Sequence, residues 1–100
     1  MARDMSVYRE VAVQSLRDPR SGLLVLRPMS GQGFPPTMKV SCGRQLVLDY
    51  PEGTCFLVQA KMTDRLGGEP YLYVWHGDPV TVLTKTQAEA FLQQYRRLRL

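Results

Sequence analysis

The sequence predicts a mainly β protein (β+α), in which five or six short strands form a small antiparallel barrel or bent sheet and one amphipathic helix ends the chain. Between residues 45 and 83, apolar runs of strand length alternate with clusters of Gly, Pro and Asp. Such clusters provide the dihedral angles of chain reversals, and their recurrence about every 8–12 residues is typical of small all-β folds. Residues 86–98 show the apolar spacing of a helix instead. An SH3-like barrel is the first choice and an OB-like barrel the second, and both are analogies of fold that carry no function.

The composition bounds the class of protein. Its 100 residues suit one domain, and the net charge of +4 permits an acidic partner without requiring one. No apolar run approaches the ~20 residues of a membrane helix, and the first ten residues carry charges where a signal peptide is apolar. We therefore expect a cytoplasmic protein without a membrane partner, in which residues 1–5 are disordered.

The N-terminal segment, residues 6–16, fits two patterns. A helical stripe that begins at Tyr8 competes with an alternation of valines. Three valines favour a strand, because β-branched side chains lose χ1 freedom in a helix. Residues 18–22 then form a hairpin turn, with a Pro and a Gly at positions that such turns prefer, and residues 23–27 return as the partner strand. The interpretation is a β-hairpin, with a helix over residues 6–16 as the alternative.

The middle of the chain predicts a long loop and further strands. Residues 28–37 hold three prolines and two glycines, which exclude regular structure. A short strand over residues 39–41 and a tight turn over residues 42–44 follow. Four more strands are predicted, over residues 45–50, 54–62, 71–76 and 80–83. One face of the second of these starts apolar and ends polar, as in a strand that runs out to the rim of a barrel.

The C-terminal helix has a start signal and an apolar stripe. Thr86 and Glu89 have the spacing of a capping box. The stripe consists of Ala88, Phe91, Leu92, Tyr95 and Leu98. Strand 71–76 is apolar on both faces, so both faces must be covered. We therefore expect the helix to cover one face of this strand.

Three aromatic rings alternate along that same strand, namely Tyr71, Tyr73 and Trp75. One hypothesis is a stacking platform for exposed bases, flanked by Lys61 and Arg65, on which each base contributes about 1–3 kcal/mol. The other is that the rings lie buried beneath Phe91 and Tyr95 of the helix, since large rings bury much apolar area. The second is favoured because the helix stripe needs a partner face.

A basic set in or beside the predicted turns forms a candidate nucleic-acid or anion-binding site, consisting of Lys39, Arg44, Lys61, Arg65 and Lys85. If these side chains converge on one rim they form a phosphate-contact surface, and if they scatter they are ordinary solubilising charges. Acidic residues in the same loops favour scatter. Gly67 and Gly68 have N–H groups that suit an anion, although a flexible turn explains the same residues.

The remaining reactive side chains predict neither catalysis nor a metal site. His76 beside Asp78 or Asp64 has the parts of a proton-transfer pair, but a histidine that begins an exposed turn is far commoner. Cys42 and Cys55 are expected as reduced, packed thiols, with a disulfide as the alternative. Because there is one histidine and two cysteines, zinc would lack ligands. No catalytic residue and no cofactor are predicted.

Two segments carry a resemblance. The run YPEGTCF at residues 50–56 and the run AKMTDRLGGEPYLY at residues 60–73 together resemble uncharacterised small bacterial proteins carried on integron cassettes and plasmids. The resemblance covers a limited part of the chain. It implies a bacterial cytoplasmic origin and assigns no activity and no site residue.

Three functional hypotheses follow. The leading one is a non-enzymatic binding module that contacts nucleic acid or an acidic protein surface through its cationic loops. The second is a homodimeric assembly protein that uses an apolar strand or helix surface. The third is a small-ligand binder with a pocket under the 28–37 loop.

Overall fold

The computed structural model describes residues 8–42, 44–63, 68–75 and 80–98, with the backbone alone for residues 44, 45 and 96–98. The six strands of its sheet are β1 (Arg9–Arg17), β2 (Leu24–Pro28), β3 (Val40–Ser41), β4 (Cys55–Thr63), β5 (Tyr71–Val74) and β6 (Thr81–Leu83). The helices within these ranges are α1 (Arg44–Leu48) and α2 (Lys85–Leu98). The prediction of a mainly β fold with a C-terminal helix is confirmed. The expected disorder of residues 1–5 lies outside the described residues.

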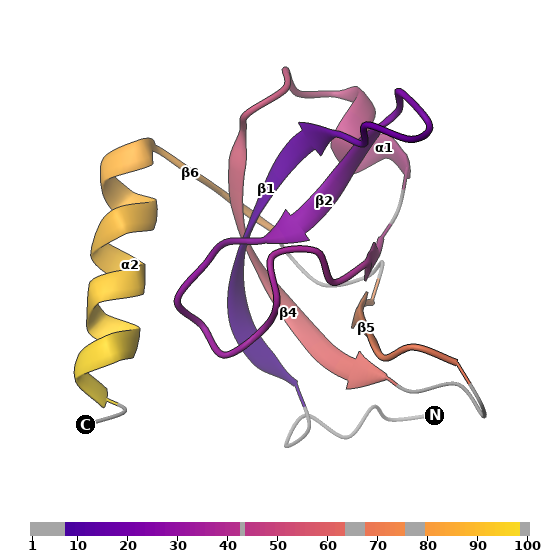
Figure 1. The fold of residues 1–100 in the computed structure, drawn as a ribbon. Helices are drawn as coiled ribbons and strands as arrows, with labels where there is room; N and C mark the ends of the chain where they lie inside the picture. The colour runs from indigo at the N-terminus through magenta and orange to yellow at the C-terminus, as the bar shows by residue number, and fades with distance from the viewer. Residues whose placement is uncertain (1–7, 43, 64–67, 76–79, 99–100) are drawn as a thin grey trace.

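The sheet is bent so far that it nearly closes into a barrel (Figure 1). Its strand order is β2-β1-β4-β5-β3, and β6 pairs with β4 outside this path. Every pair is antiparallel except β3–β5, which is parallel, so the sheet is mixed. β2 and β3 contact each other at the two ends of the path without forming a hydrogen-bonded ladder. The barrel therefore has one open seam, between β2 and β3.

The nine residues of β4 organise the barrel. Its first half pairs with β1 along one edge and with β6 along the other, and its second half pairs with β5. Alternate side chains face inward and join a core cluster, which consists of Val11, Val13, Leu26, Phe34, Phe56, Val58, Ala60, Leu72 and Val74. Because side chains alternate along a strand, Cys55, Leu57, Gln59 and Lys61 of β4 face outward.

The N-terminal hairpin is confirmed. β1 and β2 pair antiparallel from Val13 with Pro28 to Arg17 with Leu24. In the turn between them, Gly22 has a φ of +75°, and its N–H donates to the carbonyl of Asp18 at 2.8 Å. The Asp18 carboxylate accepts the N–H of Arg20, and this bond lowers the pKa of that carboxyl.

The predicted strand over residues 45–50 is wrong, because the structure has the helix α1 there. A short apolar run does not distinguish a strand from a buried helical turn by its periodicity. Leu46 and Val47, which an extended strand would point to opposite faces, both pack against the core cluster. α1 therefore covers one end of the barrel (Figure 1).

The long loop between β2 and β3 is fixed to β1 by the buried side chain of Gln32. Its amide oxygen accepts the N–H of Ala12 at 2.7 Å, and its amide nitrogen donates to the carbonyls of Ala12 and Met29 at 2.8 Å each. These hydrogen bonds replace the backbone hydrogen bonds that a further residue of β2 would make with β1. Phe34 of the same loop is buried in the core.

α2 begins two residues earlier than its predicted capping box. The N–H of Gln87 donates to Oγ1 of Thr84 at 3.1 Å, and the N–H of Thr84 donates to the side chain of Gln87 at 2.9 Å. This reciprocal pair is a capping box that starts at Thr84, so the assignment to Thr86 and Glu89 is wrong. The sequence supports both choices, since Thr84 and Gln87 have the same spacing as Thr86 and Glu89.

The expectation that α2 covers the outward face of β5 is also wrong. α2 packs on β1, β4 and β6, and Figure 1 shows it on the opposite side of the barrel from β5. Ala88 is fully buried, and Phe91, Leu92 and Tyr95 are half-buried. The guanidinium of Arg9 lies 4.8 Å from the ring centre of Phe34 and 5.1 Å from that of Tyr95, and it donates to the Tyr95 hydroxyl. The helix stripe thus finds its partner in the outward face of β1 and the first half of β4.

Candidate aromatic and basic surface

The outward face of β5 carries the predicted aromatic side chains. Leu72 and Val74 are buried in the core, so Tyr71 and Tyr73 point outward by alternation. Trp75 follows β5 directly and is 38% exposed, while the two tyrosines are half-buried. The favoured hypothesis, burial of these rings beneath the terminal helix, therefore does not hold.

Each neighbouring strand places a lysine beside these rings. On one side, Lys61 of β4 is the direct cross-strand partner of Tyr73. On the other side, Ser41 of β3 lies beside Tyr73, and Lys39, two residues earlier, falls beside Tyr71. Both lysines are exposed. We call this surface the ladder face, and it consists of Tyr71, Tyr73, Trp75, Lys39, Ser41, Lys61 and Thr63.

A pocket of about 490 Å³ lies at the Tyr71 end of the ladder face. Its lining includes Lys39, which directly precedes β3, Ser41 of β3, Tyr71 of β5 and Glu69 of the segment that leads into β5. Neither Lys39 nor Glu69 makes an ion pair or side-chain hydrogen bond with another residue in the described part of the chain. Both charged groups are therefore available to a ligand.

The basic set predicted from the sequence is only partly brought together. Lys39 and Lys61 flank the rings of the ladder face. Lys85 begins α2, on the other side of the barrel (Figure 1). Arg44 begins α1, where the backbone alone is described, and Arg65 lies outside the described residues. Sequence reasoning missed Ser41 and Glu69, because nothing in a single sequence reveals the parallel pairing of β3 with β5.

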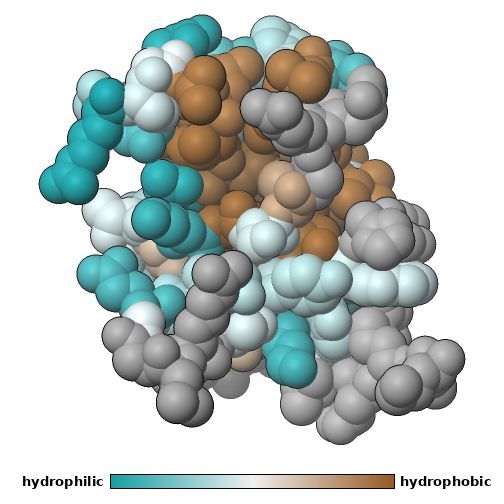
Figure 2. Space-filling model, turned by 90° about the vertical axis from the view of Figure 1, so that its right-hand side faces the viewer, coloured by the Kyte–Doolittle hydropathy of each residue, from teal (hydrophilic) through white to brown (hydrophobic). Residues whose placement is uncertain are grey.

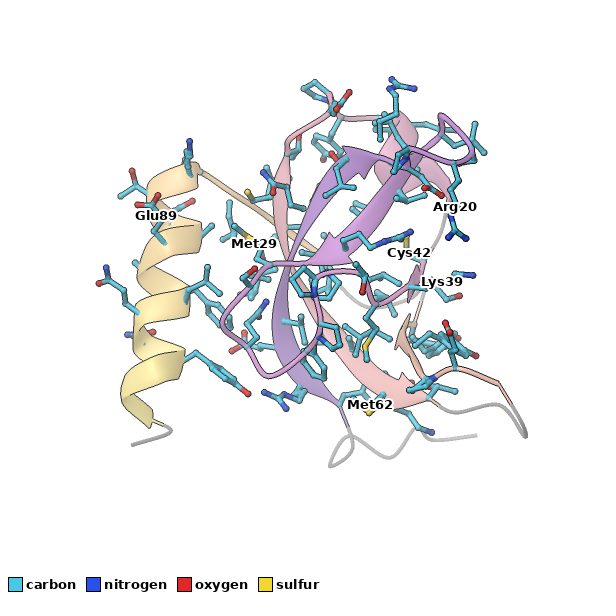
Figure 3. The ribbon with its side chains drawn as sticks, viewed as in Figure 1. Arg20, Met29, Lys39, Cys42, Met62 and Glu89 are labelled. Carbon is cyan, nitrogen blue, oxygen red and sulfur yellow. The ribbon has the colours of Figure 1, made fainter. Side chains whose placement is uncertain are left out.

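An apolar surface adjoins the ladder face on the side of the barrel away from α2. Figure 2 shows hydrophobic side chains gathered in the upper part of this side. Leu23 and Leu48 are 61% and 70% exposed, and with Leu24 and Val47 they line a pocket of about 310 Å³. A second cleft of about 310 Å³ follows the seam between β2 and β3, and Lys39 lines it as well. Figure 3 shows Arg20, Cys42 and Lys39 on this side of the barrel.

The other candidate sites from the sequence gain no support in the described residues. His76, Asp78, Asp64 and Gly67 lie outside them. Cys42 and Cys55 are free thiols, and burial raises the pKa of each. Among residues 8–42, 44–63, 68–75 and 80–98, no group of three or more His, Cys, Asp or Glu side chains has the arrangement of a metal site. No helix in the same ranges has the length and apolar character needed to cross a membrane.

The 28–37 loop, proposed as the cover of a ligand pocket, borders a pocket of about 390 Å³. Met29, Ser30 and Pro36 of the loop, Gln14 and Leu16 of β1, and Leu92 of α2 are among its lining residues. Gln32 and Phe34 fix the loop to the barrel beside it. Arg27 also lines this pocket, so its polar side chains are Gln14, Arg27 and Ser30, and the small-ligand hypothesis stays a prediction.

Comparisons of the chain with protein-family models, with curated proteins and with solved structures find no match. A resemblance to cassette-borne bacterial proteins therefore remains a sequence-based expectation. Function is inferred below from the ladder face and its neighbours.

Proposed function

We propose that the protein is a non-enzymatic binding module for single-stranded nucleic acid, which it binds across the ladder face. The observation that carries this proposal is the register of the three strands. It sets one lysine on each side of the row of rings, namely Lys61 of β4 and Lys39, which directly precedes β3. Single-stranded binding combines stacking on aromatic rings with cations that follow the backbone.

The spacing of the rings favours a single strand over a duplex. Alternate residues of a strand lie roughly 7 Å apart, whereas stacked bases in a duplex are separated by about 3.4 Å. Bases that meet successive rings must therefore unstack from one another, which a single strand permits. Lys39 and Lys61 lie to either side of β5 and are offset by two residues along it, so their backbone positions are about 12 Å apart. A single strand whose backbone crosses β5 between Tyr71 and Tyr73 can therefore place one phosphate beside each lysine.

We further infer that the barrel is OB-like, ahead of the SH3-like alternative. Closing the seam gives the strand circuit β1-β2-β3-β5-β4, with a parallel β3–β5 pair and a helix between β3 and β4. This order is the circuit of a five-stranded OB barrel with its capping helix. OB barrels bind oligonucleotides on the face of their second and third strands and at the loops beside it. The seam cleft lies between β2 and β3, and the ladder face adjoins it through β3, so the analogy of fold supports binding near this edge of the ladder face.

The test is binding of a fluorescently labelled oligothymidine, followed by anisotropy at low and high salt. We expect affinity to fall steeply as salt rises, because phosphate contacts release counterions. Lys39→Glu and Lys61→Glu should each weaken binding strongly. Lys85→Glu is the matched control, since it makes the same charge change on the side of α2 and should leave binding nearly unchanged. Binding that is indifferent to salt, or equally weakened by all three variants, would contradict the proposal.

A second candidate function, homodimerisation, is favoured by the exposed apolar surface around α1. Leu23 and Leu48 are exposed beside the apolar pocket that they line with Leu24 and Val47. Light scattering at micromolar concentration distinguishes this candidate. A dimer that Leu48→Glu converts to a monomer would support it, and a monomer throughout the concentration range would exclude it.

A further inference from the structure

The pocket at the Tyr71 end of the ladder face has a lining of mixed charge. Lys39 carries a positive charge on one side, and the Glu69 carboxylate carries a negative one. Phosphate is poorly suited to a pocket that holds a carboxylate, because like charges repel. A group that combines hydrogen-bond donors with a flat aromatic surface suits it better, since it can pair with the carboxylate and stack on the tyrosine.

The volume and position of the pocket fit a nucleobase. About 490 Å³ lies within the range of sites for small organic ligands. Tyr71 belongs both to the lining of the pocket and to the row of rings, so a strand that follows the rings reaches the pocket at its end. Unpaired bases present their Watson–Crick edge to protein side chains, and this is how single strands are recognised by sequence.

The carboxylate of Glu69 selects among the bases. An ionised carboxylate only accepts hydrogen bonds, and its two oxygens match two adjacent parallel donors, as they do in a pair with arginine. Guanine is the base whose Watson–Crick edge offers such a pair, at N1–H and the exocyclic N2 amino group. Uracil, thymine and adenine each offer one donor group there. The Ser41 hydroxyl, also in the lining, either donates or accepts a bond.

We propose that this pocket is a guanine site, in which the base stacks on Tyr71, the Glu69 carboxylate accepts hydrogen bonds from N1–H and N2–H, and Lys39 pairs with the adjoining phosphate. The site deepens the proposed function and rests on it. It gives the ladder face a preferred base at one end, whereas stacking on the remaining rings tolerates any base.

The test compares oligothymidines that carry a single guanine or a single hypoxanthine, which lacks only the N2 amino group. Wild-type protein should bind the guanine oligomer at least about fivefold more tightly, in line with the discrimination of a two-bond contact to a base edge. Glu69→Gln should remove this difference, because an amide has one acceptor oxygen. Glu89→Gln is the matched control, on α2 at the opposite side of the barrel (Figure 3).

Failure of this site is distinguishable from failure of the proposed function. If all oligomers bind with equal affinity, or if Glu69→Gln retains the preference for guanine, the guanine site is overturned while single-strand binding stands. If no oligomer binds at low salt, single-strand binding fails. Titration with guanosine and inosine monophosphates, followed by amide chemical shifts near Glu69 and Tyr71, then decides the pocket alone. Equal shifts with the two nucleotides would overturn it.

Discussion

The two halves of β4 present outward faces with opposite surroundings. In the first half, Cys55 is buried and Leu57 half-buried on the side where α2 packs, and Lys85 at the start of that helix lies close enough to act on the Cys55 thiol. In the second half, Lys61 is exposed beside Tyr73, and β5 takes the place that β6 holds earlier. One strand is therefore covered by a helix at one end and contributes to the exposed ladder face at the other.

This difference shows which of two apolar sheet faces an amphipathic helix packs against. The face of β1 and the first half of β4 offers small or aliphatic side chains such as Ala12, which is fully buried, and Leu57, together with the Arg9 guanidinium that contacts Tyr95. The face of β5 offers large rings that are interleaved with lysines on the adjacent strands. Burying a lysine head is costly, whereas a small apolar face lets the helix approach closely. The helix therefore packs on the first face and leaves the second uncovered by α2.

The largest effect is expected at the ladder face. Replacing both Tyr71 and Tyr73 by Ala removes two stacking surfaces, each contributing about 1–3 kcal/mol, so affinity for single-stranded oligonucleotides should fall by about 30-fold or more. Anisotropy titrations at low salt measure this loss. The pair of Phe substitutions keeps the rings and should bind nearly as the wild type does. An Ala double variant with unchanged affinity would place binding elsewhere on the molecule.

The second-largest effect is expected on stability, at the half of β4 that α2 covers. Ala88 is fully buried where α2 meets the sheet, so Ala88→Leu should overpack this contact and lower the free energy of unfolding by about 1–3 kcal/mol. Urea denaturation measures this change in the free energy of unfolding. Ala90 is exposed on the same helix, and Ala90→Leu should change stability by less than about 0.5 kcal/mol. Equal stability of the two variants would mean that α2 does not pack through Ala88.

A smaller effect should locate the start of α2. Thr84→Ala removes the hydroxyl that accepts the N–H of Gln87, and loss of such a cap lowers stability by about 1 kcal/mol. Thr86→Ala alters the residue that the sequence pattern favoured as the cap, and it should be nearly neutral. Thermal unfolding of the two variants side by side decides between the two caps. A larger loss for the Thr86 variant would restore the sequence-based assignment.

The smallest effect on stability is expected at the β1–β2 turn, which adjoins neither half of β4. The pKa of Asp18 is lowered in the folded protein, chiefly by the hydrogen bond from the N–H of Arg20. The charged carboxylate therefore stabilises the fold above its unfolded pKa of about 4, and this contribution is lost as the pH falls through the lower folded value. Asp18→Asn should be slightly less stable than the wild type at pH 7 and equal to it near pH 2. A difference that grows toward low pH would reverse the assigned sign.

Local signals predicted most of the strands. The hairpin of β1 and β2, the strand β4 and the strand β5 follow from alternation and turn residues, which act over a few neighbouring positions. The helix α1 was not predictable in this way. Its five residues form a helix because Leu46 and Val47 both pack against the core at the end of the barrel. This core surface exists only in the folded chain.

The candidate site was predictable in its residue types and not in its geometry. Tyr71, Tyr73, Trp75 and Lys61 are visible as a pattern along two strands that follow each other in the sequence. The contribution of Lys39 depends on a parallel pairing between segments some thirty residues apart, and its partner Glu69 in the pocket depends on the same pairing. The rings are not covered by α2 because that helix packs on the other side of the barrel. The sequence contains two apolar sheet faces, and its pattern does not indicate which of them α2 covers.

Gln32 has a consequence for how the molecule behaves in a crowded solution. Where β2 ends at Pro28, the edge of β1 would otherwise offer the N–H of Ala12 to an extended chain, since the Ala12 carbonyl already accepts the N–H of Met29. The side-chain amide of Gln32 occupies that edge instead, so that it is satisfied within the same chain and without a further strand. Exposed edges of this kind template association between copies. One glutamine thus protects the protein from joining sheets with its neighbours at this point of β1.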